Sequence, residues 1–463
     1  MKTKPKSIPI SMLVLINVAT ILSIRNWPFL AEYGFSSFFF LIVAAASFFI
    51  PVSLVAAELA SGWPQPGGIY VWVKEALGKR MAFLSVLLLW ISNVVWYPTI
   101  LSFLAVTLTY AINPTLAHNV WVNFFVTVGI FWSVLIANFF GVKFSGWLSS
   151  IAVVLGTLLP GLLLIAFGCL WFCSGQTCQI TCSAKTLLPT LNHFDELAFL
   201  AGVLLSFAGM EMNAFHANNI DNPQKNFPRS IFFSLKVILL LTLLGTFSIG
   251  IVIPKEQISL VSATMETISF YFHHYGWDSW IPLIALLIGF GSFGGMSVWI
   301  SGTNQGLLSA LELAGVRSNL LKVNKNQAPV RILVLQGVIV SALCSLTFIM
   351  PTLSSSFWIL TALASQFYII VYILLFLSAL LLRYKRADVY RAYRVPGGKI
   401  GLTSIAALGI VSCGFALAIS FVPPGQLETG NLLFYEAFFA AGWLMLASLL
   451  FLIKQENKAP AMG

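Results

Sequence analysis

Long apolar runs, each about the length of a membrane-spanning helix, follow one another along the chain with short polar segments between them. An α-helix needs roughly 20 apolar residues to cross the hydrocarbon core of a bilayer, and it satisfies its backbone hydrogen bonds internally. Twelve such runs occur, at residues 8–30, 36–60, 81–112, 120–140, 147–173, 197–220, 229–253, 280–313, 329–350, 356–382, 400–422 and 432–453. The pattern predicts an all-α membrane protein with twelve transmembrane helices.

Composition excludes a soluble protein. Hydrophobic residues make up 59% of the 463 residues and charged residues only 9%, whereas a soluble domain carries about 25% charged residues. The first run follows Lys2, Lys4 and Lys6 and therefore imitates a secretory signal peptide. No small-residue cleavage site follows it and equally long runs come later, so we interpret it as a retained first span.

The basic residues predict how the chain lies in the membrane. If the N-terminus is cytoplasmic, 21 of the 25 basic residues fall in segments on the cytoplasmic side. Only Lys185 and Lys255 fall in outside loops, and Arg25 and Lys236 lie within spans. This asymmetry is the positive-inside pattern. It predicts a multi-pass protein of the cell inner (cytoplasmic) membrane with both termini cytoplasmic. Because the charges are spread over many loops, a nucleic-acid partner is not expected.

The first span contains a helix-breaking sequence at about mid-membrane depth. Ser23 and Ile24 lead into Arg25-Asn26-Trp27-Pro28. Pro28 has no N–H to donate and disfavours helical geometry at Trp27, so the helix is predicted to stop and restart there. An arginine at this depth is costly in lipid and is expected to face protein or water.

The sixth span has a similar interruption, Ser206-Phe207-Ala208-Gly209-Met210-Glu211. Broken helices at corresponding places in two halves of a chain point to a transporter's binding site, where half-helix ends hold charged groups. Their amide ends suit a carboxylate and their carbonyl ends an ammonium, which together describe an amino acid. The structural alternative is a proline kink in one span and a glycine packing contact in the other.

Several short motifs follow one another along the chain. They are Ala57–Ala60 with Pro66–Val73, Leu205–Glu211 leading into Asp221–Pro223, Asn324–Asn326 with Pro329, and Val395–Lys399. In these motifs the chain, from about residue 10 to 453, resembles the amino acid–polyamine–organocation superfamily and, within it, the bacterial glutamate:γ-aminobutyrate antiporter family.

The resemblance implies a five-plus-five inverted repeat with broken helices 1 and 6, and substrate held between spans 1, 3, 6, 8 and 10. It divides the chain into a transport core (1–383), two accessory helices (384–453) and a short cytoplasmic tail (454–463). Glu211 matches the family's sixth-span glutamate, and Tyr368 and Tyr372 match two inward-facing tenth-span tyrosines. Their i, i+4 spacing places both tyrosines on one helix face. The candidate substrate-binding residues are Ser23, Arg25, Asn26, Trp27, Ser206, Phe207, Gly209, Tyr368 and Tyr372.

The chain departs from the antiporter pattern in three places. Arg25 and Asn26 stand where those antiporters resemble Tyr-Glu, and Gly295 stands where they carry a glutamate. The long C-terminal tail that plugs their cytoplasmic side is not expected here. Arg25 has two interpretations: it clamps an anionic substrate, or it forms a structural or gating pair with Glu211. Either role disfavours arginine as cargo. Glu211 is also a candidate for proton coupling.

The cysteines predict at most a structural bridge. Cys178 lies near Cys173 and Cys182 at the outer end of the fifth span, where an oxidising exterior permits a disulfide with either. Their spacing does not predict a metal site, and no cofactor is expected.

The sequence therefore predicts a secondary transporter of small amino acids by alternating access, working as an exchanger or linked to protons. A membrane amino-acid sensor that binds without transport is the alternative. An enzyme is not expected, because the sequence has neither a His-Glu-x-x-His nor a Gly-x-Ser-x-Gly nucleophile motif, and no nucleotide-binding loop predicts an ATP-driven pump.

Overall fold

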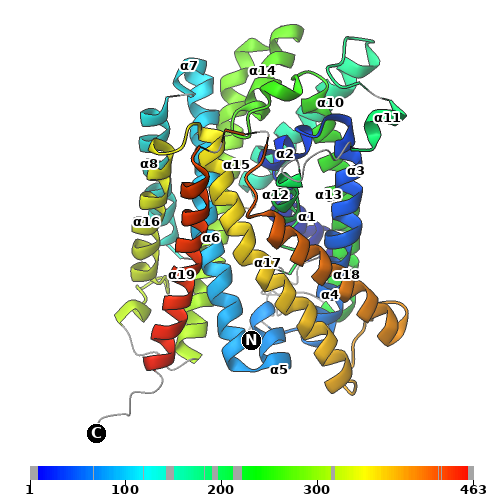
Figure 1. Ribbon diagram of the computed structural model, residues 1–463, viewed down its shortest axis with the longest axis vertical. Helices are drawn as coiled ribbons and strands as arrows, with labels where there is room; N and C mark the ends of the chain where they lie inside the picture. The colour runs from blue at the N-terminus through cyan, green and yellow to red at the C-terminus, as the bar shows by residue number, and fades with distance from the viewer. Residues whose placement is uncertain are drawn as a thin grey trace, which may run out of the picture.

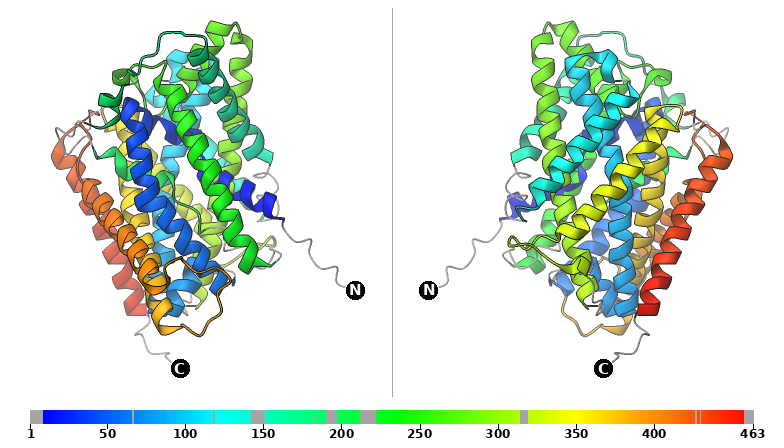
Figure 2. Two further views of the ribbon diagram at one scale, coloured as in Figure 1. Left: turned by 90° about the vertical axis from the view of Figure 1, so that its right-hand side faces the viewer. Right: turned by 90° about the vertical axis from the view of Figure 1, so that its left-hand side faces the viewer.

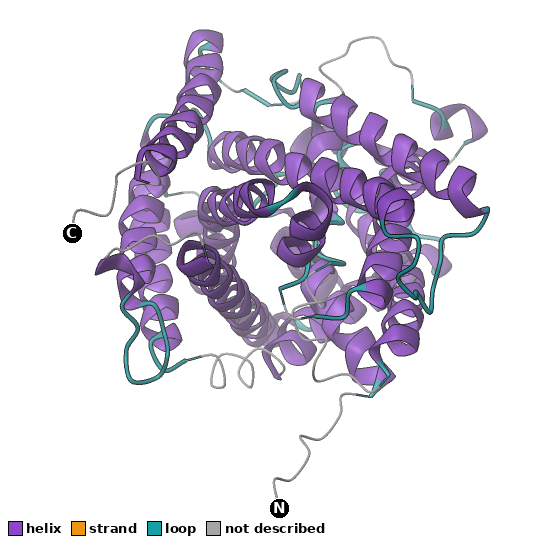
Figure 3. Cartoon of the chain, turned by 90° about the horizontal axis from the view of Figure 1, so that it is seen from below, coloured by secondary structure: helices purple, strands orange, loops and turns teal. Residues whose placement is uncertain are grey.

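The structure is a computed structural model, and it describes residues 9–65, 67–117, 119–141, 151–181, 183–189, 197–211, 222–313, 319–425, 427–428 and 430–456. Within these ranges every regular element is a helix (Figure 3). The α-helices are α1 (Ile10–Ile21), α2 (Trp27–Ala31), α3 (Ser37–Ala44), α4 (Ile50–Gly62), α5 (Ile69–Leu77), α6 (Lys79–Ile112), α7 (Pro114–Ala117), α8 (Val120–Asn138), α10 (Leu159–Cys173), α11 (Ala184–Leu187), α12 (Phe199–Ser206), α13 (Pro223–Gly250), α14 (Ala263–Tyr275), α15 (Ile281–Leu313), α16 (Val330–Cys344), α17 (Leu353–Lys385), α18 (Gly398–Ile419) and α19 (Leu432–Glu456).

Shorter turns of helix join or interrupt these elements. They are η1 (Ile24–Asn26), η2 (Gly34–Ser36), η3 (Ala45–Phe49), η4 (Val154–Leu158), η7 (Lys255–Gln257), η8 (Asp278–Trp280), η9 (Asn319–Leu321) and η10 (Ser345–Phe348).

Nine helical segments among the described residues are long and apolar enough to cross a membrane. They coincide with nine of the twelve predicted runs. The predicted spans that are not among the nine are the first and the sixth, which are interrupted, and the twelfth, which corresponds to α19. The all-helical prediction is confirmed, while the count of twelve spans and the inverted repeat stay predictions.

The bundle is organised around two long helices, α6 and α17, which pack along each other (Figure 1). Helix α6 is buried over most of its length and also packs along α15. Helices α18 and α19 lie at the edge of the bundle beside α17 (Figure 2). Helices α5 and α14 lie at opposite ends of the bundle, and we name the two ends after them (Figure 1).

The first predicted span is broken, but earlier than the sequence suggests. Helix α1 ends at Ile21, Ser23 is extended (φ −135°, ψ 120°), and η1 then leads into α2. Pro28 occupies the first turn of α2. Its missing N–H costs nothing there, and its fixed φ suits a helix start. The prediction that Pro28 marks the stop was therefore wrong in position, because the proline begins the second half-helix.

The sixth span is also interrupted where predicted. Helix α12 ends at Ser206, and Gly209 adopts φ +122°, a conformation that side chains with a β-carbon rarely take. The chain is described as far as Glu211, so the predicted restart of the helix lies outside the described residues, as does the motif Asp221–Pro223 except for its last two residues.

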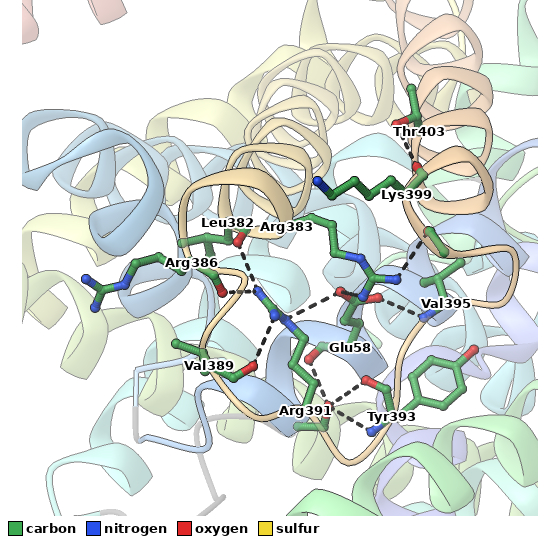
Figure 4. Close-up of polar contacts among 12 residues, drawn as sticks. Glu58, Leu382, Arg383, Arg386, Val389, Arg391, Tyr393, Val395, Lys399 and Thr403 are labelled. Atoms are coloured by element: carbon green, nitrogen blue, oxygen red, sulfur yellow. Dashed lines mark hydrogen bonds and ion pairs between the residues drawn. The ribbon is translucent and has the colours of Figure 1, made fainter.

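A buried ion cluster fastens α4 to the segment that joins α17 and α18 (Figure 4). The Arg383 guanidinium lies 2.7 Å from Glu58 Oε1, and Arg391 Nε lies 3.5 Å from the same oxygen. The backbone N–H of Val395 donates to Glu58 Oε2 at 2.8 Å, and Arg383 also donates to the Gly398 carbonyl at 3.2 Å. Two of the sequence motifs, Ala57–Ala60 and Val395–Lys399, thus meet in one cluster.

The cysteine prediction is partly answered. Cys173 forms no disulfide, so the pairing of Cys178 with Cys173 is not present. Cys182 lies outside the described residues, and its pairing with Cys178 stays a prediction.

Candidate functional site

A cavity of about 100 Å³ lies where the two helix interruptions meet. Its walls come from the α1–α2 break, α6, η4, α12, α15 and α17. They include Thr20, Ser23, Ile24, Arg25, Asn26, Phe29, Ser92, Asn93, Trp96, Thr157, Ser206, Ser292, Gly295, Trp299, Thr361 and Tyr368. The space is large enough to hold water, since one water needs at least about 10–15 Å³ by this kind of measure.

Arg25 is the charged group of this cavity, and it is almost fully buried, with 4% of its surface exposed. Its guanidinium donates to Thr99 Oγ1 at 2.7 Å. It also lies over the Trp96 ring at 4.8 Å and the Phe357 ring at 5.6 Å. The side chains of α6 and α17 therefore hold the guanidinium between two aromatic rings, and this arrangement fixes its direction.

No carboxylate neutralises Arg25 among the residues that the structure describes, and its Nε has no hydrogen-bond partner. A buried cation without a counter-ion is costly unless a ligand supplies one. Rings and a threonine hydroxyl compensate only part of that cost. The guanidinium is therefore set to receive an anionic group, and its fork suits a carboxylate.

Glu211 is engaged elsewhere, so the predicted pair with Arg25 is not formed in this structure. The Tyr368 hydroxyl donates to Glu211 Oε1 at 2.6 Å, and the Tyr372 hydroxyl donates to Oε2 at 3.0 Å. The Tyr372 oxygen also accepts the Gly209 N–H at 2.8 Å. Both tyrosines thus lie on one face of α17 as the spacing predicted. They tie the carboxylate of the sixth span to the tenth.

The predicted substrate-binding residues divide into two groups. Five line the cavity: Ser23, Arg25, Asn26, Ser206 and Tyr368. The other four, Trp27, Phe207, Gly209 and Tyr372, are not part of the cavity wall.

The four residues outside the cavity wall pack against neighbouring helices or position other residues. Trp27 packs so closely on α13 that no room remains for a β-carbon at Gly245. Phe207 stacks on Phe49, with ring centroids 4.8 Å apart. The distinction between these groups is not visible in the sequence, because both kinds of residue surround the same breaks.

The family resemblance placed span 3, which is α6, beside the substrate, but sequence reasoning named none of the α6 residues that line the cavity. Ser92, Asn93 and Trp96 line the cavity from this helix, and Thr361 and Trp299 face it from α17 and α15. The Asn93 amide nitrogen donates to the Leu89 carbonyl at 2.8 Å, so its oxygen is left as an acceptor. Polar residues in the middle of a long apolar run were an available signal.

Comparison with known proteins now adds the family. The family model described as amino acid permease matches residues 9–446. The chain belongs to this family. The permease is 37% identical to an uncharacterized transporter of Legionella pneumophila, with 96% of each chain covered. It is 29% and 30% identical to the glutamate/gamma-aminobutyrate antiporters of two Lactococcus lactis strains, IL1403 and MG1363, with 95% of this permease and 88% of each relative covered.

These matches confirm the resemblance that the motifs carried. The permease is a multi-pass membrane protein of a family of amino acid transporters and antiporters. They do not support the alternative of a sensor that binds without transport.

Proposed function

We propose that this permease moves small amino acids through the bilayer by alternating access, as an exchanger or with proton coupling. Glutamate and γ-aminobutyrate are the proposed cargo class. The antiporter names of two relatives support exchange of these solutes. The observation that carries the proposal is the buried, unneutralised guanidinium of Arg25 in the cavity where the two helix interruptions meet.

In the proposed binding mode Arg25 receives a substrate carboxylate. The guanidinium offers its unpartnered Nε and a second nitrogen as a bidentate fork, while Thr99 and the two rings keep it in place. The substrate ammonium lies toward acceptors on the opposite walls, among them the Asn93 oxygen and the Ser206 hydroxyl. A cationic side chain would meet Arg25 unfavourably, so arginine and polyamines are poor cargo.

Glu211 is the proposed coupling residue. It is buried at the second break, beside the tyrosine that lines the cavity. A carboxylate at such a depth is a natural proton carrier in a transport pathway. Its link through Tyr368 gives one route by which substrate and proton binding influence each other.

We propose that the α5 end lies on the cytoplasmic side of the inner membrane and the α14 end outside, because the basic residues follow the positive-inside pattern in that orientation. We propose twelve spans with both termini on the cytoplasmic side. We propose residues 1–383 as the transport core, in inverted repeats, and 384–453 as the accessory helices.

Counterflow into proteoliposomes tests the function. Vesicles preloaded with glutamate, γ-aminobutyrate, alanine, arginine or putrescine are offered the same labelled solute at two pH values. We expect exchange of glutamate or γ-aminobutyrate, and little of the two cations. Uptake driven by a proton gradient alone would favour symport over exchange, whereas binding without any flux would restore the sensor.

Arg25→Ala tests the binding mode in the same assay. We expect at least a roughly 100-fold lower kcat/KM for exchange, since a charge-assisted bidentate pair is lost and the opposing partner remains unpaired. Arg386→Ala is the matched control, because Arg386 lies at the protein surface in an exposed pair with Glu75. Unchanged transport of every amino acid by Arg25→Ala would refute this mode.

A further inference from the structure

A second and larger cavity, of about 780 Å³, opens at the α14 end of the bundle. It lies between the end of α2, η7, the start of α17 and the segment before α19. Its polar lining consists of Glu32, Lys255, Glu256, Gln257, Ser259, Thr352, Ser354 and Glu428. This volume falls in the range of small-molecule sites, roughly 300–1,000 Å³.

Glu32 is the unusual member of that lining. Only 4% of its surface is exposed, and its carboxylate forms no hydrogen bond or ion pair with any part of the chain that the structure describes. The hydrogen bonds at this position are those of its backbone N–H, which closes α2. A carboxylate with little exposure and no donor from the protein favours a ligand that brings a positive charge.

The charges around Glu32 leave the cavity negative. Glu256 and Glu428 add two carboxylates, against the single ammonium of Lys255. Lys255 is exposed and is not within ion-pair distance of Glu32. No other titratable side chain lines the cavity from α6, α7, α8 or α17.

A small ammonium fits this lining better than a metal ion does. The described residues contain no group of three or more His, Cys, Asp and Glu side chains placed to hold a metal. Instead the wall alternates hydroxyls with apolar side chains. Ser259 and Ser354 lie 3.3 Å apart, oxygen to oxygen, and Val106, Val261 and Leu353 supply apolar surface. That combination suits a primary ammonium on a short aliphatic body.

The two cavities share a partition. Glu32 ends the same short helix that Arg25 and η1 precede, about two helical turns away. The segment that lines the outer cavity at Ser259 continues to Thr264, whose hydroxyl donates to the Ile24 carbonyl at 3.3 Å in the wall of the central cavity. Two segments, the one from Ile24 to Glu32 and the one from Ser259 to Thr264, thus connect the linings of the two cavities.

We propose that the outer cavity is a second binding site, which takes the ammonium group of an arriving amino acid or amine and uses Glu32 as its counter-charge. The site deepens the proposed function and rests on it, because it would serve cargo on its way to Arg25. The central cavity then selects the carboxylate end and the outer cavity selects the amine end.

Burial gives this site a distinct pH dependence, since it raises the pKa of Glu32 to about 8, with Lys255 opposing and Glu256 adding to the rise. Only the ionised carboxylate attracts an ammonium. The affinity for an amine should therefore increase as pH rises through about 8, where an ordinary glutamate would already be fully ionised.

The test uses n-butylamine, which keeps the ammonium and lacks the carboxylate that Arg25 needs. A primary alkyl amine of the lysine type stays protonated to about pH 10. Binding is measured by calorimetric titration of the full chain in nanodiscs, in 0.15 M NaCl, from pH 6.5 to 9. Wild type, Glu32→Gln, Arg25→Ala and Glu266→Gln are compared; Glu266 lies on α14 and does not line the cavity.

We expect at least a tenfold weaker affinity for butylamine in Glu32→Gln, and wild-type affinity in Arg25→Ala and Glu266→Gln. Affinity in the wild type should rise severalfold between pH 7 and 9, a measurement that needs no variant to fold. Equal affinity in Glu32→Gln, or no butylamine binding by the wild type, would overturn the site. If the wild type binds butylamine but shows no amino acid counterflow, the proposed transport function is refuted and the amine site in the outer cavity is retained.

Discussion

Two buried sites in this permease contain arginine, and they differ in whether the chain supplies a carboxylate to pair with it. At the α5 end, Arg383 and Arg391 share the carboxylate of Glu58, whose second oxygen accepts the Val395 N–H. In the middle of the bundle, Arg25 has a threonine hydroxyl and two rings, and no carboxylate among the described residues. All of these side chains are buried.

The contrast separates structure from function. A cation whose counter-charge is part of the chain needs nothing from outside, and its role is to hold two segments together. A cation without one keeps an unmet demand, which a ligand can meet. Solvent exposure does not distinguish the two kinds of arginine, because it is low for both. The presence or absence of a carboxylate partner distinguishes them.

The largest expected effect is loss of stability from Glu58→Ala. Removing the shared carboxylate leaves Arg383 and Arg391 buried without an anion, and breaking a buried pair in this way costs about 3–5 kcal/mol. The apparent melting temperature of the purified protein should fall by several degrees. Glu75→Ala is the control, because its pair with Arg386 is half-exposed and is worth about 0–1 kcal/mol. Equal effects of the two substitutions would contradict the contrast.

Arg25→Met should have the reverse pattern. An apolar side chain of similar length removes an uncompensated buried cation, so the melting temperature should stay the same or rise. Exchange should nevertheless fall at least roughly 100-fold, because the carboxylate loses its partner. Melting curves and counterflow on the same preparation check both halves. A variant that loses stability and transport together would make Arg25 a structural residue like Arg383.

A smaller effect is expected at the tyrosines that hold Glu211. Tyr372→Phe removes the hydroxyl that donates to Glu211 and accepts the Gly209 N–H, so exchange should fall roughly tenfold. Because the bonds to the carboxylate change, the pH profile of transport should also shift. Tyr435→Phe serves as the control, since its hydroxyl accepts from Trp358 away from the cavity. An unshifted pH profile in Tyr372→Phe would argue against Glu211 as the coupling group.

Local sequence patterns predicted much of this architecture. Apolar runs predicted the helices, and Gly209 lies at the break of the sixth span as predicted, whereas Pro28 begins the second half-helix of the first span instead of ending the first half. The pairing of Glu58 with Arg383 joins residues 325 positions apart and has no local signal. The supposed pair of Arg25 and Glu211 failed for a related reason: two tyrosines from a third helix already satisfy the carboxylate.

The placement of Trp27 has a consequence for how such a transporter can diversify. Its ring occupies space that only glycine leaves on α13, while the guanidinium two residues earlier donates to Thr99 on α6. The anchor of this short segment and its cargo-facing charge are therefore separate side chains. A substitution at position 25 can therefore change the substrate specificity of the transporter and leave the packing of α2 on α13 intact.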